Sequence, residues 1–514
     1  MNKVAKIYSA ATVGLESYLV EVEVDIGAGL PSFAIVGLGD KAIDESKERI
    51  RAAIKNSGMF FPQHRLTINL APADVKKEGP SFDLPMAVGI LLSGEQFDKV
   101  DDFKESIFIG ELSLDGNLRN VTGVLPIVSF AKEKGFKQVF LPEVNAPEAS
   151  LIKGIEIRPV ETLLQLVKHL RGEEIVESYK VHKVSKIEKN ESQCDFMYIA
   201  GQEQVKRALE IAAAGNHNIL LSGPPGSGKT LLARSLPTIL PEMDEDEMLE
   251  VTKIYSVTGL LDSDNAFVSE RPFRSPHHTT SSVAMVGGGT WPRPGEISLS
   301  HRGVLFLDEF PEFSRSVLEA LRQPLEDGIV TVSRATGSLT FPAEFLLVAA
   351  QNPCPCGFLS DPEKRCICTP TQIIRYQKKV SGPILDRIDI HMEVPRLKYE
   401  KLAASPPAGG VVEESARVRE RVQSARDRQA VRFKNTKIKS NSEMSSREIK
   451  QYCKLAEAAE KLIAQAVDSM KLSARVYHRL LKLARTIADL EGSDLILTSH
   501  IAEALQYRPK EKVY

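Results

Sequence analysis

The chain has 514 residues, which is more than a single hydrophobic core accommodates, so its length predicts two to four domains. Apolar residues make up 42% and charged residues 26%, a balance typical of soluble globular proteins. The chain has 66 basic and 68 acidic side chains, so its net charge is close to zero and any basic surface that binds nucleic acid has to be local.

Three features argue against a secreted or membrane protein. Six cysteines in so long a chain do not form a disulfide framework. Apolar runs are too short to span a membrane, and Glu16, Glu21 and Glu23 interrupt any N-terminal secretory signal. We therefore expect a cytoplasmic protein without membrane contact.

Residues 1–172 mix strand and helix patterns. Apolar and acidic side chains alternate from Ser17 to Ile26, which predicts a half-exposed strand. Residues 41–56 predict an amphipathic helix that ends before Gly58. Further strands are expected at 65–70 and 138–141, and an apolar helix at 85–92. These elements predict an α+β domain.

Two segments of this domain resemble the Lon protease domain. Lys77–Ser81 is similar to the loop that carries the catalytic serine of Lon, and Gly110–Gly116 with Gly123–Pro126 is similar to a second Lon segment. In Lon a lysine follows that second segment and pairs with the serine, whereas the nearest equivalent here is Leu125. Leucine cannot take a proton from a hydroxyl, so we expect Ser81 to be a structural turn residue. The resemblance implies a non-proteolytic domain for assembly or nucleic-acid contact.

Residues 173–193 are polar and charged, with little to bury. This composition predicts a linker, and a solvated tether is favoured over a charge-specific binding site.

Residues 194–396 are expected to form an ATPase core around the segment Gly-Pro-Pro-Gly-Ser-Gly-Lys-Thr. A predicted helix at 202–214 and an apolar strand at 219–221 precede this segment, and a second helix follows. This setting is that of a P-loop, in which backbone N–H groups and the helix N-terminus surround phosphate, lysine reaches the β/γ-phosphates and threonine binds Mg²⁺. A chance glycine-rich turn is the alternative. The expected ATP-binding residues are Gly223, Pro224, Pro225, Gly226, Ser227, Gly228, Lys229 and Thr230.

Two later strands are expected to complete the site. Residues 304–307 predict a buried strand that ends in Asp308 and Glu309, the Walker B arrangement, in which the first acid completes the Mg²⁺ shell and the second polarises water. A further strand at 345–350 precedes Asn352, which would hold the attacking water as the sensor-1 residue of AAA+ proteins does. An asparagine at a strand end is otherwise a common cap.

Two arginines resemble residues that act on nucleotide in AAA+ proteins. Arg387 lies in Ser-Gly-Pro-Ile-Leu-Asp-Arg, a segment similar to the one that carries the arginine finger in the branch with magnesium chelatase and MCM helicases. An ordinary salt bridge with Asp386 or Asp389 is the alternative. Arg475 precedes an amphipathic helix at 476–490 and resembles the sensor-2 residue of the AAA+ lid.

Two insertions are candidates for substrate contact. A glycine-rich stretch lies between Phe273 and His301, and residues 328–342 predict a hairpin. The resemblance to the magnesium-chelatase branch implies that both project toward a central pore. Ordinary surface loops are the alternative. The residues expected to contact DNA are His277, His278, Arg293 and Arg334.

Four cysteines lie within fifteen residues: Cys354, Cys356, Cys366 and Cys368. Four thiolates on two short arms suit tetrahedral Zn²⁺. A redox pair and unligated thiols remain alternatives.

Residues 397–514 are expected to form a helical lid after a loop at 405–410. Residues 414–431 predict a helix with many arginines, for which a solvated face is favoured over DNA binding. A last helix is expected at 499–505.

Together these segments resemble the ComM/YifB family of magnesium-chelatase-like proteins. The resemblance implies a multidomain α/β protein with a Lon-like α+β domain, a P-loop AAA+ core with a parallel sheet, and a C-terminal helical lid. It also implies a hexameric, nucleotide-promoted ATPase that uses ATP and Mg²⁺ to migrate DNA branches in natural transformation or recombination, with recombination proteins as possible partners. A protein-remodelling ATPase like the chelatase motor is the alternative. A Lon-type peptidase is disfavoured by Leu125.

Overall fold

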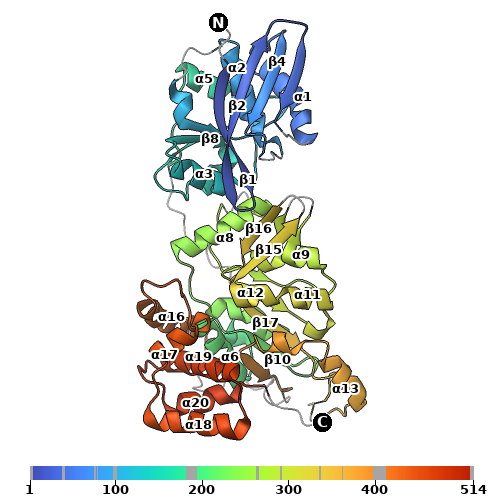
Figure 1. The fold of residues 1–514 in the computed structure, drawn as a ribbon, viewed down its shortest axis with the longest axis vertical. Helices are drawn as coiled ribbons and strands as arrows, with labels where there is room; N and C mark the ends of the chain where they lie inside the picture. The colour runs from blue at the N-terminus through green and yellow to red at the C-terminus, as the bar shows by residue number, and fades with distance from the viewer. Residues whose placement is uncertain are drawn as a thin grey trace. The chain divides into compact units, whose positions relative to one another are not determined.

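The computed structural model describes residues 4–37, 41–74, 77, 79–96, 101–180, 194–261, 266–289, 292–334, 337–359, 361, 363–397 and 413–509. The chain divides into two compact units, drawn in Figure 1. Unit 1 comprises Met1–Ile187 and Glu245–Val268, and unit 2 comprises Glu188–Asp244 and Ser269–Tyr514. Across the described ranges, no helix combines the length and the apolar composition that crossing a membrane requires.

Unit 1 is built on a seven-stranded mixed sheet in the order β3-β4-β2-β1-β5-β8-β9. Strand β2 pairs antiparallel with β1 and β4, and the other neighbouring strands pair parallel. Val20, Val22 and Val24 of β2 are fully buried, which confirms the strand predicted from their alternation. The strands are β1 (Ala5–Val13), β2 (Glu16–Gly27), β3 (Ser32–Val36), β4 (Arg65–Ala71), β5 (Ser106–Phe108), β8 (Gln138–Pro142) and β9 (Glu156–Val160), with a small hairpin of β6 (Glu111–Leu112) and β7 (Leu118–Arg119).

The helices of unit 1 enclose two hydrophobic cores. One core contains residues of α1, α2 and α5, and the other contains residues of α3 and α4. The predicted helices at 41–56 and 85–92 are confirmed as α1 and α2. The helices are α1 (Lys41–Asn56), α2 (Asp83–Ser93), α3 (Val124–Glu133), α4 (Ala146–Ala149) and α5 (Leu163–Arg171), and the 3₁₀ turns are η1 (Pro80–Phe82), η2 (Asp101–Glu105) and η3 (Glu143–Asn145).

One helix of unit 1 comes from within the segment expected to form the ATPase core. Helix α8 (Glu245–Thr258) packs on α3, and its Leu249 packs against the second core. The backbone N–H of Gly123 donates to the backbone O of Ser256 at 3.0 Å. Residues 245–268, which lie within the expected ATPase segment, therefore belong to unit 1.

The first residues after α5 differ from the solvated tether that the sequence predicts. Val176 is buried, and its backbone O accepts a hydrogen bond from Arg158. The backbone N–H of Tyr179 donates to the backbone O of Ile157 in β9 at 2.8 Å. These backbone hydrogen bonds and the buried Val176 side chain hold residues 176–179 in unit 1. Residues 181–193 of the expected linker lie outside the described residues.

The segments that resemble Lon lie at η1, at the β6–β7 hairpin and at the start of α3. Ser81 is half-buried in η1, and its backbone O accepts a hydrogen bond from the N–H of Gly110 at 2.9 Å. The Leu125 side chain is fully buried in the second core, and its backbone N–H donates to Glu148 at 3.2 Å. The side chain at position 125 thus serves packing in this unit.

Unit 2 is built on a five-stranded parallel sheet in the order β11-β14-β17-β10-β18. The strands predicted at 219–221, 304–307 and 345–350 are confirmed, and they occupy the three central positions. All four residues of β14 are buried, as an interior parallel strand requires. The strands are β10 (Ile219–Ser222), β11 (Phe273–Arg274), β14 (Val304–Leu307), β17 (Leu346–Gln351) and β18 (Ile390–Glu393).

The C-terminal helices share one hydrophobic core with this sheet. Helices α16 and α19 pack on α6, which leads into β10, and Figure 1 shows both, in brown to red, beside it. Arg421 of α16 pairs with Glu210 of α6 at 2.5 Å, so part of its arginine-rich face binds α6. The helices are α6 (Glu203–Gly215), α16 (Ser415–Arg432), α17 (Ser446–Tyr452), α18 (Glu457–Met470), α19 (Ala474–Leu490) and α20 (Thr498–Gln506), with η7 (Asn441–Glu443) between α16 and α17.

The remaining elements of unit 2 surround the sheet. The predicted hairpin is confirmed as the antiparallel pair β15–β16. The expected loop at 405–410 lies outside the described residues. The elements are α7 (Lys229–Ser235), α9 (Ser282–Val286), β12 (Gly287–Gly288), β13 (Arg293–Pro294), α10 (Glu296–Leu299), α11 (Arg315–Ala320), α12 (Arg322–Asp327), β15 (Ile329–Arg334), β16 (Gly337–Pro342), α13 (Pro370–Gln377) and α14 (Gly382–Leu385), with the 3₁₀ turns η4 (Phe196–Tyr198), η5 (Leu236–Ile239) and η6 (Phe310–Glu312).

Candidate functional site

The three central strands of the unit 2 sheet end at one edge. Ser222 of β10 lies beside Gln351 of β17, and Leu307 of β14 lies beside Ala349 of β17. Because the strands are parallel, the residues that follow each of them meet at their carboxyl ends, where open α/β sheets bind ligands. The segment 223–230, Asp308 and Asn352 are therefore brought to the same edge.

The loop at 223–230 needs its glycines for two different reasons. A Cβ at Gly223 would stand 2.3 Å from the backbone O of Val394, so the chains approach too closely for a side chain. Gly226 and Gly228 have φ of 77° and 90°, in the left-handed region that favours glycine. A Cβ at either of these two positions would meet nothing within 4 Å, so the backbone there is open to a ligand.

Lys229 lies across this loop with its side chain largely buried. Its Nζ donates to the backbone O of Gly223 at 2.8 Å and of Pro224 at 2.9 Å, and to Oδ1 of Asn352 at 3.3 Å. Burial lowers the pKa of Lys229, and the nearby Asp308 opposes that shift. The ammonium group thus joins the loop to the strand end that carries Asn352.

Thr230 and Asp308 form the second contact of the site. The Thr230 hydroxyl donates to Oδ2 of Asp308 at 2.9 Å, and Oδ1 of Asp308 accepts from the backbone N–H of Glu309 at 2.9 Å. Mg²⁺ that is bound to nucleotide phosphates commonly has a hydroxyl oxygen and a carboxylate oxygen of the protein near it as ligands or hydrogen-bond partners. The buried Ser227 hydroxyl has no hydrogen-bond partner within the described chain. These donors and acceptors fit a magnesium nucleotide.

Glu309 has a strained backbone and a histidine partner. Its φ is 51°, a left-handed conformation that is uncommon for a residue other than glycine. Oε2 of Glu309 lies 3.1 Å from Nδ1 of His278, which follows strand β11, the neighbour of β14. The rings of His277 and His278 lie 4.1 Å apart. One of the residues expected to contact DNA thus lies against the expected catalytic acid.

Arg387 and Arg475 both pair with Glu326 of α12. Nη2 of Arg387 lies 2.5 Å from Oε2 of Glu326, and Nη2 of Arg475 lies 3.3 Å from Oε1. Hydrogen bonds from Arg387 lower the pKa of Glu326, with further support from Arg475. The acid that binds Arg387 is therefore Glu326, and neither Asp386 nor Asp389, the partners that the sequence offers.

The loop that carries Arg387 is held by α19. Arg479 of α19 is buried, and its Nη1 donates to the backbone O of Ile388 at 2.5 Å. Asp389 instead lies 3.2 Å from Nδ1 of the buried His217, whose Nε2 lies 2.8 Å from the Thr486 hydroxyl. The C-terminal helices thus fix the position of the loop through polar contacts in the interior.

The other residues expected to contact DNA lie on three separate segments. His277 is exposed in the loop after β11, and Arg293 is exposed in β13. Arg334 is the last residue of β15, and its side chain is outside what the structure describes.

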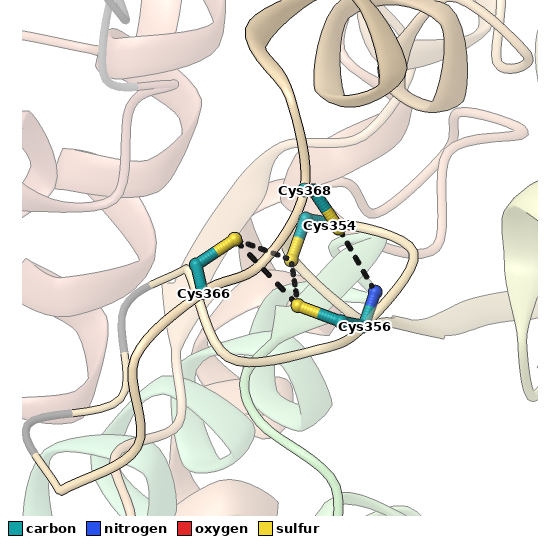
Figure 2. A group of neighbouring side chains, drawn as sticks. All are labelled: Cys354, Cys356, Cys366 and Cys368. Atoms are coloured by element: carbon teal, nitrogen blue, oxygen red, sulfur yellow. Dashed lines mark hydrogen bonds between the residues drawn. The ribbon is translucent and has the colours of Figure 1, made fainter.

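The four clustered cysteines converge on one point between β17 and α13 (Figure 2). Their Sγ atoms all lie within 4.8 Å of one another. Cys354 is buried and the other three are half-buried. The sequence expectation that two short arms bring four thiols together is confirmed.

Two contacts of the site were not predicted from the sequence. Glu326 lies 61 and 149 residues from the arginines that it binds, and it is one acid among many on exposed helices. The position of His278 after the strand beside β14 is the signal that places it near Glu309, and it depends on the sheet order.

Models of the magnesium chelatase family match most of the chain. The model described as "Magnesium chelatase, subunit ChlI" matches residues 195–402. "Subunit ChlI of Mg-chelatase" matches residues 22–145, and "Magnesium chelatase, subunit ChlI C-terminal" matches residues 412–508.

Several curated proteins are similar over nearly the whole chain. Competence protein ComM of Haemophilus influenzae is 45% identical over 510 residues, covering 98% of this chain and 97% of that protein. YifB of Escherichia coli is 42% identical over 510 residues, covering 99% and 97%. The protein Rv2897c of Mycobacterium tuberculosis is 42% identical over 505 residues, covering 98% of each chain.

Proposed function

This chain belongs to the ComM/YifB family of magnesium-chelatase-like proteins, and on that premise we propose that it is an ATP-hydrolysing AAA+ motor that acts on DNA. The observation that carries the proposal is the meeting of Lys229, Thr230, Asp308 and Asn352 at one edge of a parallel sheet. The similarity to a competence protein supports a role in natural transformation. We propose that this role, or a related one in recombination, is branch migration of DNA in the cytoplasm.

Each residue at the sheet edge has a proposed role. Residues 223–228 surround the phosphates with backbone N–H groups, and Lys229 binds the β/γ-phosphates. Thr230 and Asp308 hold the magnesium ion, which supplies charge neutralisation on the phosphate oxygens. Glu309 accepts a proton from water, and Asn352 holds that water in place. The His278 contact supports this role for Glu309, because it fixes the side chain that has to face the water.

We place Arg387 and Arg475 at the nucleotide of an assembled ring, with Arg387 entering the site of the adjacent subunit. Their pairing with Glu326 supports this, because in a single chain both guanidinium groups are bound to an acid that is not part of the sheet edge. A hexamer promoted by nucleotide is the assembly that we propose, and a lone subunit should then be a poor ATPase.

DNA contact is proposed for the two insertions of the ATPase core. Arg334 is the last residue of the first hairpin strand, β15. Arg293 and His277 are exposed on the other insertion. Recombination proteins are proposed as further partners. Because phosphate contacts release counterions, binding at these residues should weaken strongly as salt rises.

Unit 1 is proposed to be a non-proteolytic relative of the Lon protease domain. The burial of Leu125 supports this, since a dyad would need an amine at the position that it fills. Its proposed role is assembly or contact with nucleic acid.

A protein-remodelling ATPase is the second candidate function. It is favoured by the family models, which are named for a magnesium chelatase subunit. Such a motor would hydrolyse ATP with the same residues and would have no DNA substrate.

The deciding experiment measures ATP turnover of the assembled protein with no DNA and with single-stranded, duplex and branched DNA, at low and at higher salt. We expect stimulation by branched or single-stranded DNA that is larger at low salt. A ring with ATPase activity that neither binds nor responds to any DNA form at low salt would exclude the DNA motor and leave the remodelling ATPase.

A further inference from the structure

The cysteine cluster has the dimensions of a metal site. The Sγ atoms of Cys354 and Cys356 lie 3.4 Å apart, those of Cys354 and Cys366 3.7 Å apart, and those of Cys356 and Cys366 3.6 Å apart (Figure 2). Four sulfurs bound to zinc at about 2.3 Å in a tetrahedron are about 3.8 Å from one another. A disulfide would hold two sulfurs at about 2.0 Å, so none of these pairs is oxidised.

A backbone hydrogen bond supports the same assignment. The N–H of Cys356 donates to Sγ of Cys368 at 3.4 Å. Such outer contacts orient metal ligands and offset the charge of thiolates. Four thiolates close the coordination of zinc and leave no open position, which is the pattern of structural and not of catalytic sites.

The loop that carries the cysteines also borders the nucleotide site. Asn352, which binds Lys229, stands two residues before Cys354. Gly357 is buried against the phosphate loop, since a Cβ there would lie 2.5 Å from Cδ of Pro225 and 3.8 Å from Cγ of Asn352. At the far side, the side chain of Gln377 in α13 donates to the backbone O of Pro353 at 3.2 Å.

We propose that Cys354, Cys356, Cys366 and Cys368 bind one zinc ion whose function is to fix Asn352 and to press Gly357 against Pro225. The zinc takes no part in the reaction. It ties the two arms of the loop together, so that the amide of Asn352 and the phosphate loop keep their relative positions. This inference rests on the proposed nucleotide site, and it adds to that site a metal that stabilises its geometry.

The first test measures the metal itself. Elemental analysis of the full-length protein, purified without added metal, should give one zinc per chain. The four thiols should resist a thiol reagent in the folded protein and become reactive after chelation. The variant Cys366→Ser should lose zinc, while Cys194→Ser, which changes a half-buried cysteine outside the cluster, should retain it. Zinc near zero with freely reactive thiols, or a disulfide within the cluster found by mass spectrometry, would overturn the proposal.

The second test asks whether the zinc fixes the phosphate loop. Amide hydrogen exchange of residues 223–230 and the affinity for a fluorescent ATP analogue are measured before and after zinc removal by a chelator, and again after zinc is restored. We expect faster exchange and weaker binding without zinc, both reversed by its return. Unchanged exchange and affinity in folded, zinc-free protein would refute the bracing role, and the ATPase proposal would stand unaffected.

The third test separates the loop contact from the metal. Gly357→Ala keeps all four thiols, but its Cβ meets Pro225 and its φ of 83° disfavours a side chain. Zinc content should be retained, while the affinity for the ATP analogue falls. Because a displacement of about 1 Å at a reacting centre costs roughly 10²-fold, turnover should fall by about 10- to 100-fold. The matched control is Gly135→Ala, where φ is 82° and a Cβ meets nothing, so that it shares the backbone strain without the contact. Gly357→Ala protein with unchanged nucleotide affinity would contradict the contact, and wild-type protein that binds zinc without any ATPase activity would count against the proposed function alone.

Discussion

Unit 2 contains two polar clusters that differ in how they are built. The first cluster (Lys229, Thr230, Asp308 and Asn352) joins the ends of three neighbouring strands, and its side chains bond to one another. The second cluster (Arg387, Arg475 and Glu326) joins a loop, the start of α19 and α12. The sheet alone brings the first cluster together, whereas the second depends on how the C-terminal helices pack.

From this difference we infer that nucleotide binding and activation of hydrolysis depend on separate clusters. The strand-end cluster is complete within one chain. In the arginine cluster, the side chain of Glu326 is 52% exposed and that of Arg387 is 11% exposed, so water screens the pair from the carboxylate side. Ion pairs that water screens contribute on the order of 1 kcal/mol. We propose that Arg387 exchanges Glu326 for a phosphate of an adjacent subunit when the ring assembles. We infer that a single chain binds nucleotide and that assembly completes the site.

The largest expected effect comes from removing the arginine that distinguishes the second cluster. In Arg387→Ala, turnover of the assembled ring should fall by roughly 10³-fold or more, because arginine fingers contribute about 10³–10⁵-fold in other phosphoryl-transfer proteins. Nucleotide affinity of the single chain should persist, since the strand-end cluster is intact.

Mixed rings test whether Arg387 acts in trans. Mixing Arg387→Ala with Glu309→Gln subunits should restore part of the activity, because some interfaces pair an intact arginine with an intact acid. If the mixture is as inactive as either variant while co-assembly is verified, Arg387 is an ion-pairing residue of its own chain. The arginine cluster would then have no separate role in activation.

The next effect tests the strand-end cluster. Glu309→Gln keeps the shape of the side chain and removes the base, so turnover should fall by roughly 10²–10⁴-fold while nucleotide still binds. Lys229→Ala should instead weaken nucleotide binding itself. The control is Glu312→Gln, a nearby acid that pairs with Lys379 at 2.7 Å. Near-normal turnover in Glu309→Gln would remove its assignment as the base.

A smaller effect is expected from the acid that binds both arginines. Glu326→Gln should raise turnover of the assembled ring by up to about fivefold, because a partly screened ion pair on the order of 1 kcal/mol no longer competes for Arg387. Glu319→Gln is the matched control, since that acid pairs with Arg322 at 2.7 Å. A fall in turnover for Glu326→Gln would mean that Glu326 positions the arginine for the reaction, and the separation of binding from activation would be wrong.

The smallest effect on basal turnover is expected from a residue of neither cluster. Arg334→Ala should leave turnover without DNA mostly unchanged and reduce its stimulation by DNA. The slope of log binding constant against log salt concentration should become shallower by about one, as the loss of one phosphate contact predicts. Lys461→Ala, an exposed cation on α18, provides the control for charge. Equal stimulation of the Arg334 variant and the control would show that the hairpin is not the site of DNA contact.

Much of the strand-end cluster was predictable from local sequence. The apolar run 219–221 before the phosphate loop and the run 304–307 before two acids predict buried parallel strands, and both are present. Helix α1 has the bounds that its amphipathic pattern predicts. These predictions succeed because strands, helices and tight turns are specified by residues that are close together in the sequence.

By itself, the sequence determined which elements form, which face of each is buried and which residue types carry the chemistry of the sheet edge. The tertiary structure alone decided the partners: Glu326 for both arginines, His278 for Glu309, Pro225 for Gly357, and α8 for the core of unit 1. The reason is physical. A periodic pattern specifies that a face avoids water, but many surfaces satisfy that requirement equally, and a long-range contact is selected only when the packing of whole elements fixes which side chains come within reach.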